Sequence, residues 1–141
     1  MEPLNLGALP DRALLLVDSA PVIYCLDGAS SLAARFDPLF EAHAAGQLQL
    51  AITTVAIAEV LTGPLRAGDE ARTRRYRALL QSWHVVALDL DIAESAARLR
   101  ASLRLKLPDA VQVASALAIN AAALVTHDRD FKRVHTLRIL S

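Results

Sequence analysis

Short apolar runs alternate with longer helical patterns along this chain, and this alternation restricts the fold more than any other sequence feature. The runs have the length of strands, and the segments between them can hold crossover helices. The predicted strands lie at 13–17, 48–53, 85–88, 122–126 and, at an edge, 137–140. Such an order predicts an α/β fold with a parallel sheet of about five strands flanked by helices.

Capping residues and helix breakers set the boundaries of the predicted helices. Ser19 can cap the first helix, and the pair Gly63-Pro64 is predicted to stop the helix that follows the second strand. Asp91, with a glutamate three residues later, has the spacing of a capping box and is predicted to open a helix. Pro108 is predicted to open the next helix, because proline suits a first helical turn.

Length and composition bound the kind of protein. The 141 residues suit one domain, 1–141, in which residues 1–12 form an extension before the first strand. With 54% hydrophobic and 21% charged residues, the chain can bury a core. No apolar run approaches the ~20 residues that span a bilayer, and the first dozen residues lack a basic segment followed by an apolar one. We therefore expect a cytoplasmic protein without a membrane segment.

Positive charge is concentrated in one segment of the chain. The formal net charge is +0 and the pI is near 6.9, so bulk charge does not indicate nucleic-acid binding. Five arginines nevertheless fall between residues 66 and 77. Arg72, Arg74 and Arg75 are the predicted nucleic-acid contacts in this segment. The alternative is a solvated helix face, which most charge runs of this kind are.

Four carboxylates lie in or beside apolar stretches, where such groups are rarely found unless they are paired or bound to a metal. Asp18 and Asp128 follow predicted strands, so we expect them at the carboxyl edge of the sheet, where ligands bind in open α/β folds. Asp109 is in the first turn of its helix, and Glu59 interrupts an apolar helix. Convergence of these side chains in one acidic pocket would suit a divalent cation such as Mg²⁺ or Mn²⁺.

Each acid also has an explanation that needs no metal. Asp18 could cap the next helix, and Asp109 could complement its helix dipole. Asp128 could be an ordinary turn residue, with Asp130 as the alternative site residue two positions later. Glu59 could occupy a solvent-facing position of its helix. Taken together, the acids favour metal-assisted hydrolysis of a phosphodiester bond. The sequence contains no Gly-rich phosphate loop and no nucleophile elbow.

Four motifs, taken in order, match those of one protein family. They are Leu-Leu-Val-Asp-Ser (15–19), Thr-Thr-Val-Ala-Ile-Ala-Glu-Val-Leu-Thr-Gly (53–63), Leu-Pro-Asp-Ala-Val-Gln-Val-Ala-Ser-Ala (107–116) and Val-Thr-His-Asp-Arg-Asp-Phe (125–131). In these motifs the chain resembles the PIN-domain ribonucleases, most closely the VapC-type toxins of bacterial toxin–antitoxin pairs. Each motif is weak alone, but four in family order over nearly the whole chain are specific.

The resemblance implies a three-layer PIN fold and an acidic site that depends on Mg²⁺ or Mn²⁺. Position by position, it implies catalytic and metal-binding roles for Asp18, Glu59, Asp109 and Asp128. Ser19 and Thr126 match small polar positions that support the site, and Asp130 would line its rim.

The resemblance also implies endonucleolytic cleavage of RNA, a homodimer, and a cognate antitoxin that inserts a segment near the active site. The long segment before the first strand and the neutral net charge depart from the family pattern. Two other interpretations stay open. A non-catalytic PIN scaffold would be free to lose its acids, whereas a metal-dependent phosphatase or DNA nuclease would keep the site and act on another substrate.

Overall fold

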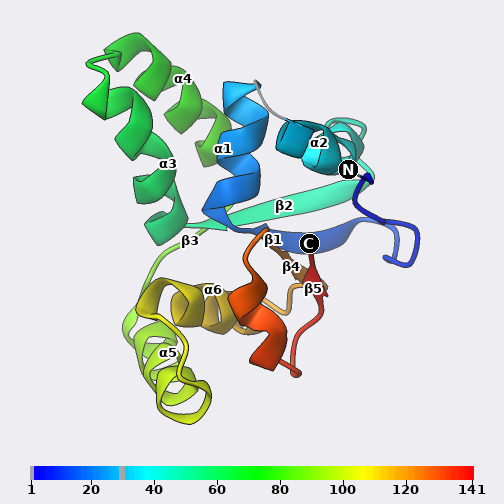
Figure 1. The fold of residues 1–141 in the computed structure, drawn as a ribbon, viewed down its shortest axis with the longest axis vertical. Coiled ribbons are helices and arrows are strands. Elements are labelled where there is room, and N and C mark those ends of the chain that lie inside the picture. The colour runs from blue at the N-terminus through cyan, green and yellow to red at the C-terminus, as the bar shows by residue number, and fades with distance from the viewer. Residues whose placement is uncertain (1, 29–30) are drawn as a thin grey trace.

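A five-stranded parallel sheet forms the centre of the molecule (Figure 1). The computed structural model describes residues 2–28 and 31–141. The strands are β1 (Ala13–Val17), β2 (Leu48–Thr53), β3 (His84–Val86), β4 (Ala123–Val125) and β5 (Ile139–Leu140). Their order is β3-β2-β1-β4-β5, and all neighbours are parallel. The predicted α/β class and the predicted sheet of about five strands are confirmed.

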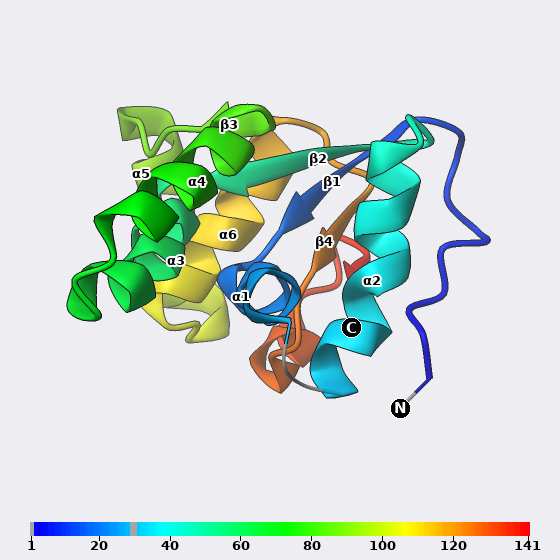
Figure 2. The same cartoon turned by 90° about the horizontal axis from the view of Figure 1, so that it is seen from above.

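Helices cover both faces of this sheet, so the fold has three layers (Figures 1 and 2). One face carries α1 (Ser19–Asp27), α2 (Ser31–Ala44), α3 (Thr54–Arg66) and α4 (Glu70–Gln81). The other carries α5 (Leu90–Leu103), α6 (Leu107–Ala118) and the 3₁₀ helix η1 (Arg129–Arg133). Among the described residues, no helix has both the length and the apolar character needed to cross a membrane.

Side chains of β1, β2, β4 and β5 alternate between two cores. Leu15 and Val17 of β1 face the core under α1 to α4, and Leu16 faces the core under α5 and α6. β2 divides in the same way, with Ile52 in the first core and Ala51 in the second. Burial of a leucine side chain contributes about 1.5–3 kcal/mol. A slip of one residue would send every strand side chain to the opposite face, so the register is strongly specified.

The predicted end of α3 at Gly63-Pro64 is wrong, because the helix continues to Arg66. After this helix the backbone becomes left-handed at Gly68, with φ +70°. The Asp69 N–H then closes the turn on the Pro64 carbonyl at 2.9 Å, which is the usual way that such a glycine ends a helix. Pro64 is buried, and burial of its ring offsets the hydrogen bond that proline cannot donate.

Two predicted helix caps are also wrong. Asp89, rather than Asp91, caps α5, and its side chain accepts the Ile92 N–H at 2.9 Å. Asp91 lies in the first turn, where a carboxylate complements the helix dipole. Asp18, rather than Ser19, is the N-cap of α1, so Ser19 is the first helical residue.

The segment before β1 packs against the domain. Leu4 is buried in the core under α1 to α4, and its N–H donates to the Arg35 carbonyl at 2.9 Å. The Arg35 guanidinium donates to the carbonyls of Glu2 and Ser141, so α2 contacts both ends of the described chain. The division into one domain with residues 1–12 as an extension stays a prediction, and the first of those residues lies outside the described ranges.

Candidate functional site

Strand register brings three polar residues together at the carboxyl edge of the sheet. β1 pairs with β4 so that Val17 opposes Val125, which makes the next residues, Asp18 and Thr126, neighbours. The register between β1 and β2 places Thr53 on the other side of Asp18. β1 is the strand from which the chain builds the sheet in both directions, and ligands of open α/β sheets bind at such switch points.

Three hydrogen bonds hold the Asp18 carboxylate. Its Oδ1 accepts from Ser19 N–H and from Gln112 Nε2, each at 2.9 Å, and its Oδ2 accepts from the Thr126 hydroxyl at 2.9 Å. Gln112 is oriented in turn by Thr53, whose hydroxyl donates to Gln112 Oε1 at 2.7 Å. The two threonines and the glutamine are buried. Because a buried amide with both ends bonded has little freedom, this network fixes the direction of Asp18.

Three aspartates, here called the acidic trio, converge beside this network. One carboxylate oxygen from each of Asp109, Asp128 and Asp130 lies within 4.8 Å of the others. Asp109 is in the first turn of α6, and Asp128 caps η1 by accepting the Asp130 N–H at 2.8 Å. The Thr126 hydroxyl accepts the Asp128 N–H at 3.0 Å while it donates to Asp18. Thr126 therefore couples Asp18 to the backbone that carries the acidic trio.

The Asp109 carboxyl group combines an unpartnered buried oxygen with a raised pKa. Its Oδ2 is buried and has no hydrogen-bond partner among the described residues. Burial and then the charges of Asp128, Asp18 and Asp130 raise the pKa of Asp109 to about 6, although the nearby charge of Lys106 opposes them. Buried polar atoms almost always have a partner, so a cation against this oxygen would supply what the protein does not.

Glu59 lies on the other side of Asp18, on α3. Burial raises the pKa of Glu59, the charge of Asp18 raises it further, and a hydrogen bond with Ser19 partly offsets both. The predicted acids thus form two sets that meet at Asp18: Glu59 with Ser19, and the acidic trio. Asp130, which the resemblance placed at the rim, is exposed and yet contributes an oxygen to the trio.

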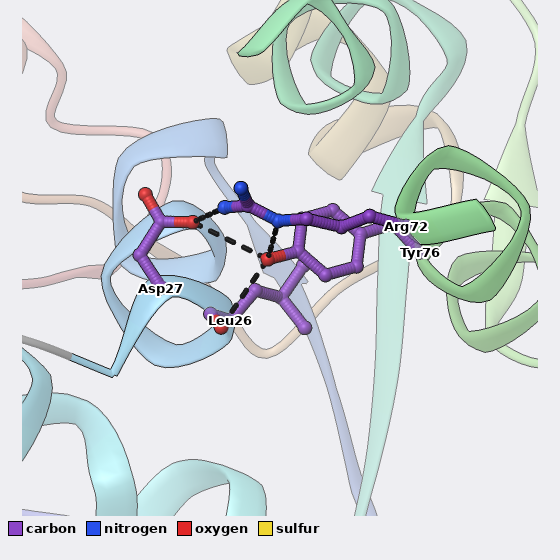
Figure 3. A network of polar contacts seen from close by, with 4 residues as sticks. All are labelled: Leu26, Asp27, Arg72 and Tyr76. Atoms are coloured by element: carbon purple, nitrogen blue, oxygen red, sulfur yellow. Dashed lines mark hydrogen bonds and ion pairs between the residues drawn. The ribbon is translucent and has the colours of Figure 1, made fainter. Parts of the chain in front are cut away.

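Arg72 makes an ion pair instead of projecting freely from α4. Figure 3 shows its guanidinium reaching α1, where Nη2 contacts Asp27 Oδ1 at 2.6 Å while Nε donates to the Tyr76 hydroxyl at 2.8 Å. That hydroxyl also lies 3.3 Å from a backbone carbonyl at the end of α1. The contacts fasten α4 to α1. Arg74 and Arg75 are exposed on α4, and their contact with nucleic acid stays a prediction.

The sequence arguments missed Gln112 and Thr53. A signal for Gln112 was available, because this amide interrupts an apolar helical run three positions after Asp109 and so lies on the same helix face. Thr53 ends the second strand, at the same edge of the sheet as Asp18. Neither residue is charged, so neither stood out as a candidate ligand.

The sequence matches one family model over most of its length. The PIN domain model covers residues 15–137, which include every acid of the site and the network around Asp18. The chain therefore belongs to the PIN-domain family. A search of curated proteins found no match.

Solved structures with the same fold include toxins and toxin–antitoxin complexes. A toxin–antitoxin complex from Klebsiella pneumoniae shares 28% identity at TM-score 0.68, covering 85% of this chain and 92% of that chain. VapBC2 from Rickettsia felis, bound to a promoter DNA fragment, shares 19% identity at TM-score 0.71, and the match covers 89% of this chain and 96% of that chain. VapC20 from Mycobacterium tuberculosis, a sarcin-ricin loop cleaving toxin, shares 16% identity at TM-score 0.66, and the match covers 83% of this chain and 92% of that chain.

Proposed function

We propose that this PIN-domain protein is a divalent-metal-dependent endoribonuclease and the toxin of a toxin–antitoxin pair. The observation that carries the proposal is the acidic trio, in which the buried Oδ2 of Asp109 lacks a partner among the described residues. Clustered carboxylates repel one another, and a bound cation removes that repulsion. Membership of the PIN family and the likeness to solved toxins support the biological role.

The side chains of the site fit Mg²⁺ or Mn²⁺. Asp109, Asp128 and Asp130 each offer a carboxylate oxygen, the donor that these cations prefer. Asp18 and Glu59 are the further proposed ligands, because both border the trio or its network. When bound, the cation would favour ionisation of a water molecule and stabilise the charge that develops on a phosphate.

The protein's own residues would orient this chemistry and exchange protons. Asp18, held by Gln112 and Thr126, keeps a fixed orientation, and its charge acts on both Glu59 and Asp109. The raised pKa of Glu59 suits a carboxyl group that takes and returns a proton in the reaction. Ser19 would support the site through its hydrogen bond with Glu59.

RNA and an antitoxin are the proposed partners. One structural neighbour is a sarcin-ricin loop cleaving toxin, and another is a toxin–antitoxin complex. A short gene beside this one that encodes a DNA-binding domain with a disordered tail would support the antitoxin. A homodimer is the proposed assembly, and light scattering on the purified protein would test it.

Millimolar Mn²⁺ is expected to raise the melting temperature of the metal-free protein. A ligand at ~100 times its Kd stabilises a folded protein by about 2.7 kcal/mol, which is roughly 10 °C for a domain of this size. Differential scanning fluorimetry after EDTA treatment measures the shift. A melting temperature that does not respond to Mn²⁺ would favour a non-catalytic scaffold over the proposed enzyme.

Gln112→Leu is expected to weaken the response to Mn²⁺ without removing any acid. The variant takes away the Nε2 donor of Asp18 and the acceptor of the Thr53 hydroxyl. Loss of such an orienting partner typically costs about 10–100-fold in metal affinity or activity. Ser115→Ala is the matched control, because Ser115 is also buried in α6 and lies outside the network. If Gln112→Leu and Ser115→Ala bind Mn²⁺ equally well, Gln112 does not orient Asp18.

The second alternative is a metal-dependent phosphatase or DNA nuclease, which could use the same acids on another substrate. Single-stranded RNA, single-stranded DNA and a phosphate monoester, each incubated with Mn²⁺ and the protein, separate these activities. Cleavage of RNA alone would support the proposal. Cleavage restricted to DNA or to the monoester would assign the site to another reaction.

A further inference from the structure

A hollow with a strong local positive charge opens beside the acidic trio. It has a volume of about 410 Å³, and its walls are η1 and the turn between α5 and α6. The cations that line it, here called the basic hollow, are Arg104, Lys106, Arg129, Lys132 and Arg133. Asp130 is the single acid among the described lining residues. Five cations against one acid are a marked excess in a protein whose net charge is +0.

The geometry of η1 turns its cations towards solvent. A 3₁₀ helix has about three residues per turn, so residues i and i+3 share a face. Phe131 and the residue after the helix, Val134, are buried on the core side. Arg129 and Lys132 share a different, exposed face that borders the hollow. Apolar packing on one side of η1 therefore presents two cations on another.

The turn between α5 and α6 forms the facing wall. α5 ends at Leu103, and its C-cap residue Arg104 has a left-handed backbone at φ 56° and donates its N–H to the Arg100 carbonyl at 3.0 Å. This uncommon conformation reverses the chain at the rim of the hollow. The Arg133 guanidinium donates to the Leu103 carbonyl at 3.3 Å, so the two walls are joined.

Most cations of the basic hollow lack an acid that neutralises them. The Lys106 ammonium is 3.8 Å from Asp130, and both side chains are exposed, so this pair is weak. Within residues 2–28 and 31–141, Arg104, Arg129 and Lys132 form no ion pair. Neighbouring unpaired cations repel one another, and a polyanion would relieve that repulsion.

We propose that the basic hollow binds the phosphate backbone of single-stranded RNA next to the bond that is cleaved. The inference rests on the proposed ribonuclease function and names the substrate-binding surface of that site. Asp130 belongs both to the acidic trio and to the lining of the hollow, so a strand with one phosphate at the trio continues across the cations. Lysine and arginine contacts to phosphate supply affinity without reading sequence.

The arginines of α4 are the rival surface. Both views place α4 well away from η1 (Figures 1 and 2). One α4 arginine, Arg72, is already paired with Asp27. Contacts from α4 would therefore reach parts of an RNA that are farther from the acidic trio than those bound in the basic hollow.

Two triple variants compare the surfaces with the same change in charge. Arg104→Ala/Arg129→Ala/Lys132→Ala empties the hollow of three cations, and Arg74→Ala/Arg75→Ala/Arg77→Ala removes three from α4. Both are made in Asp18→Asn protein, so that a fluorescein-labelled single-stranded RNA stays intact while anisotropy is measured at several salt concentrations. Each phosphate contact contributes about 0.7 to the magnitude of the slope of log K against log salt. This magnitude should therefore be smaller by about 2 in the hollow variant and by much less in the α4 variant.

The possible outcomes separate this inference from the proposed function. A slope that is unchanged in the hollow variant, or reduced as much in the α4 variant, overturns the inference even if the wild-type protein cleaves RNA. In the cleaving wild-type background, the hollow substitutions should raise KM and leave kcat nearly unchanged. Wild-type protein that cleaves no RNA with Mn²⁺ overturns the proposed function instead. If the hollow variant binds RNA normally but loses an acidic protein partner, the surface recognises protein and the inference is wrong.

Discussion

Asp18→Asn is expected to lower metal-dependent RNA cleavage by at least about 100-fold, the scale on which one well-placed electrostatic group acts. The substitution removes a charge at the point where the buried network meets the acidic trio. The fold should persist, because the Oδ1 of asparagine can still accept from Ser19 N–H, and its Nδ2 can donate to the Thr126 hydroxyl oxygen. Initial rates on RNA with Mn²⁺, and growth arrest on expression, measure the loss.

Asp91→Asn is the matched control for this experiment. It makes the same chemical change at an exposed position in the first turn of α5, away from the network. The control should cleave RNA at the wild-type rate, and circular dichroism should give the same spectrum for both variants. RNA cleavage that is unchanged in purified Asp18→Asn protein would contradict the metal-site hypothesis.

Asp109→Asn is expected to stabilise the metal-free protein and to abolish its response to Mn²⁺. The charged carboxyl of Asp109 is disfavoured by burial and by three acidic neighbours, whereas a neutral amide has a smaller desolvation cost and no charge for those neighbours to repel. The variant should therefore melt at a higher temperature than wild type in EDTA, gain nothing from Mn²⁺, and lose RNA cleavage. A misfolded variant would melt at a lower temperature in EDTA, so the two explanations for lost activity are distinguishable.

In EDTA, the difference in melting temperature between wild type and Asp109→Asn should depend on pH in one direction. The pKa of Asp109 in the folded protein is about 6, above its usual 3.8, so the folded state holds this proton more tightly than the unfolded state. Stability contributed by the group is therefore present below its usual pKa and is lost as pH rises through about 6. In EDTA, the melting temperature of wild type should fall relative to Asp109→Asn across that window and run parallel to it above. A constant difference would mean that Asp109 does not carry the raised pKa.

Much of the fold could be predicted because strand and helix signals are local. β1 and β2 have the predicted bounds, since a buried strand reads as a continuous apolar run whatever packs on it. Helix boundaries agreed less well with the structure. Gly63-Pro64 has the composition of a stop, yet Pro64 is buried and α3 continues to Arg66, two residues before the left-handed Gly68. The end of this helix depends on tertiary packing, which a local sequence pattern does not show.

The candidate site, like the fold, could be predicted from the sequence only in part. Its acids could be placed from sequence because Asp18 and Asp128 follow strands, and parallel strands end at one edge. Gln112 could not be assigned a role in this way, because its contact with Asp18 joins residues 94 positions apart. The inclusion of Asp130 in the acidic trio depends on the path of η1, and no pairing of strands specifies that path.

The amino-acid sequence by itself determined the order of strands and helices and the acidic character of the sheet edge, because apolar periodicity and residue type are properties of short segments. Only the tertiary structure decided which acids share a space, why the pKa of Asp109 is raised, and where unpaired cations gather. The reason is physical. Burial and Coulomb interactions depend on distances through space, and folding sets those distances between residues that the chain holds far apart.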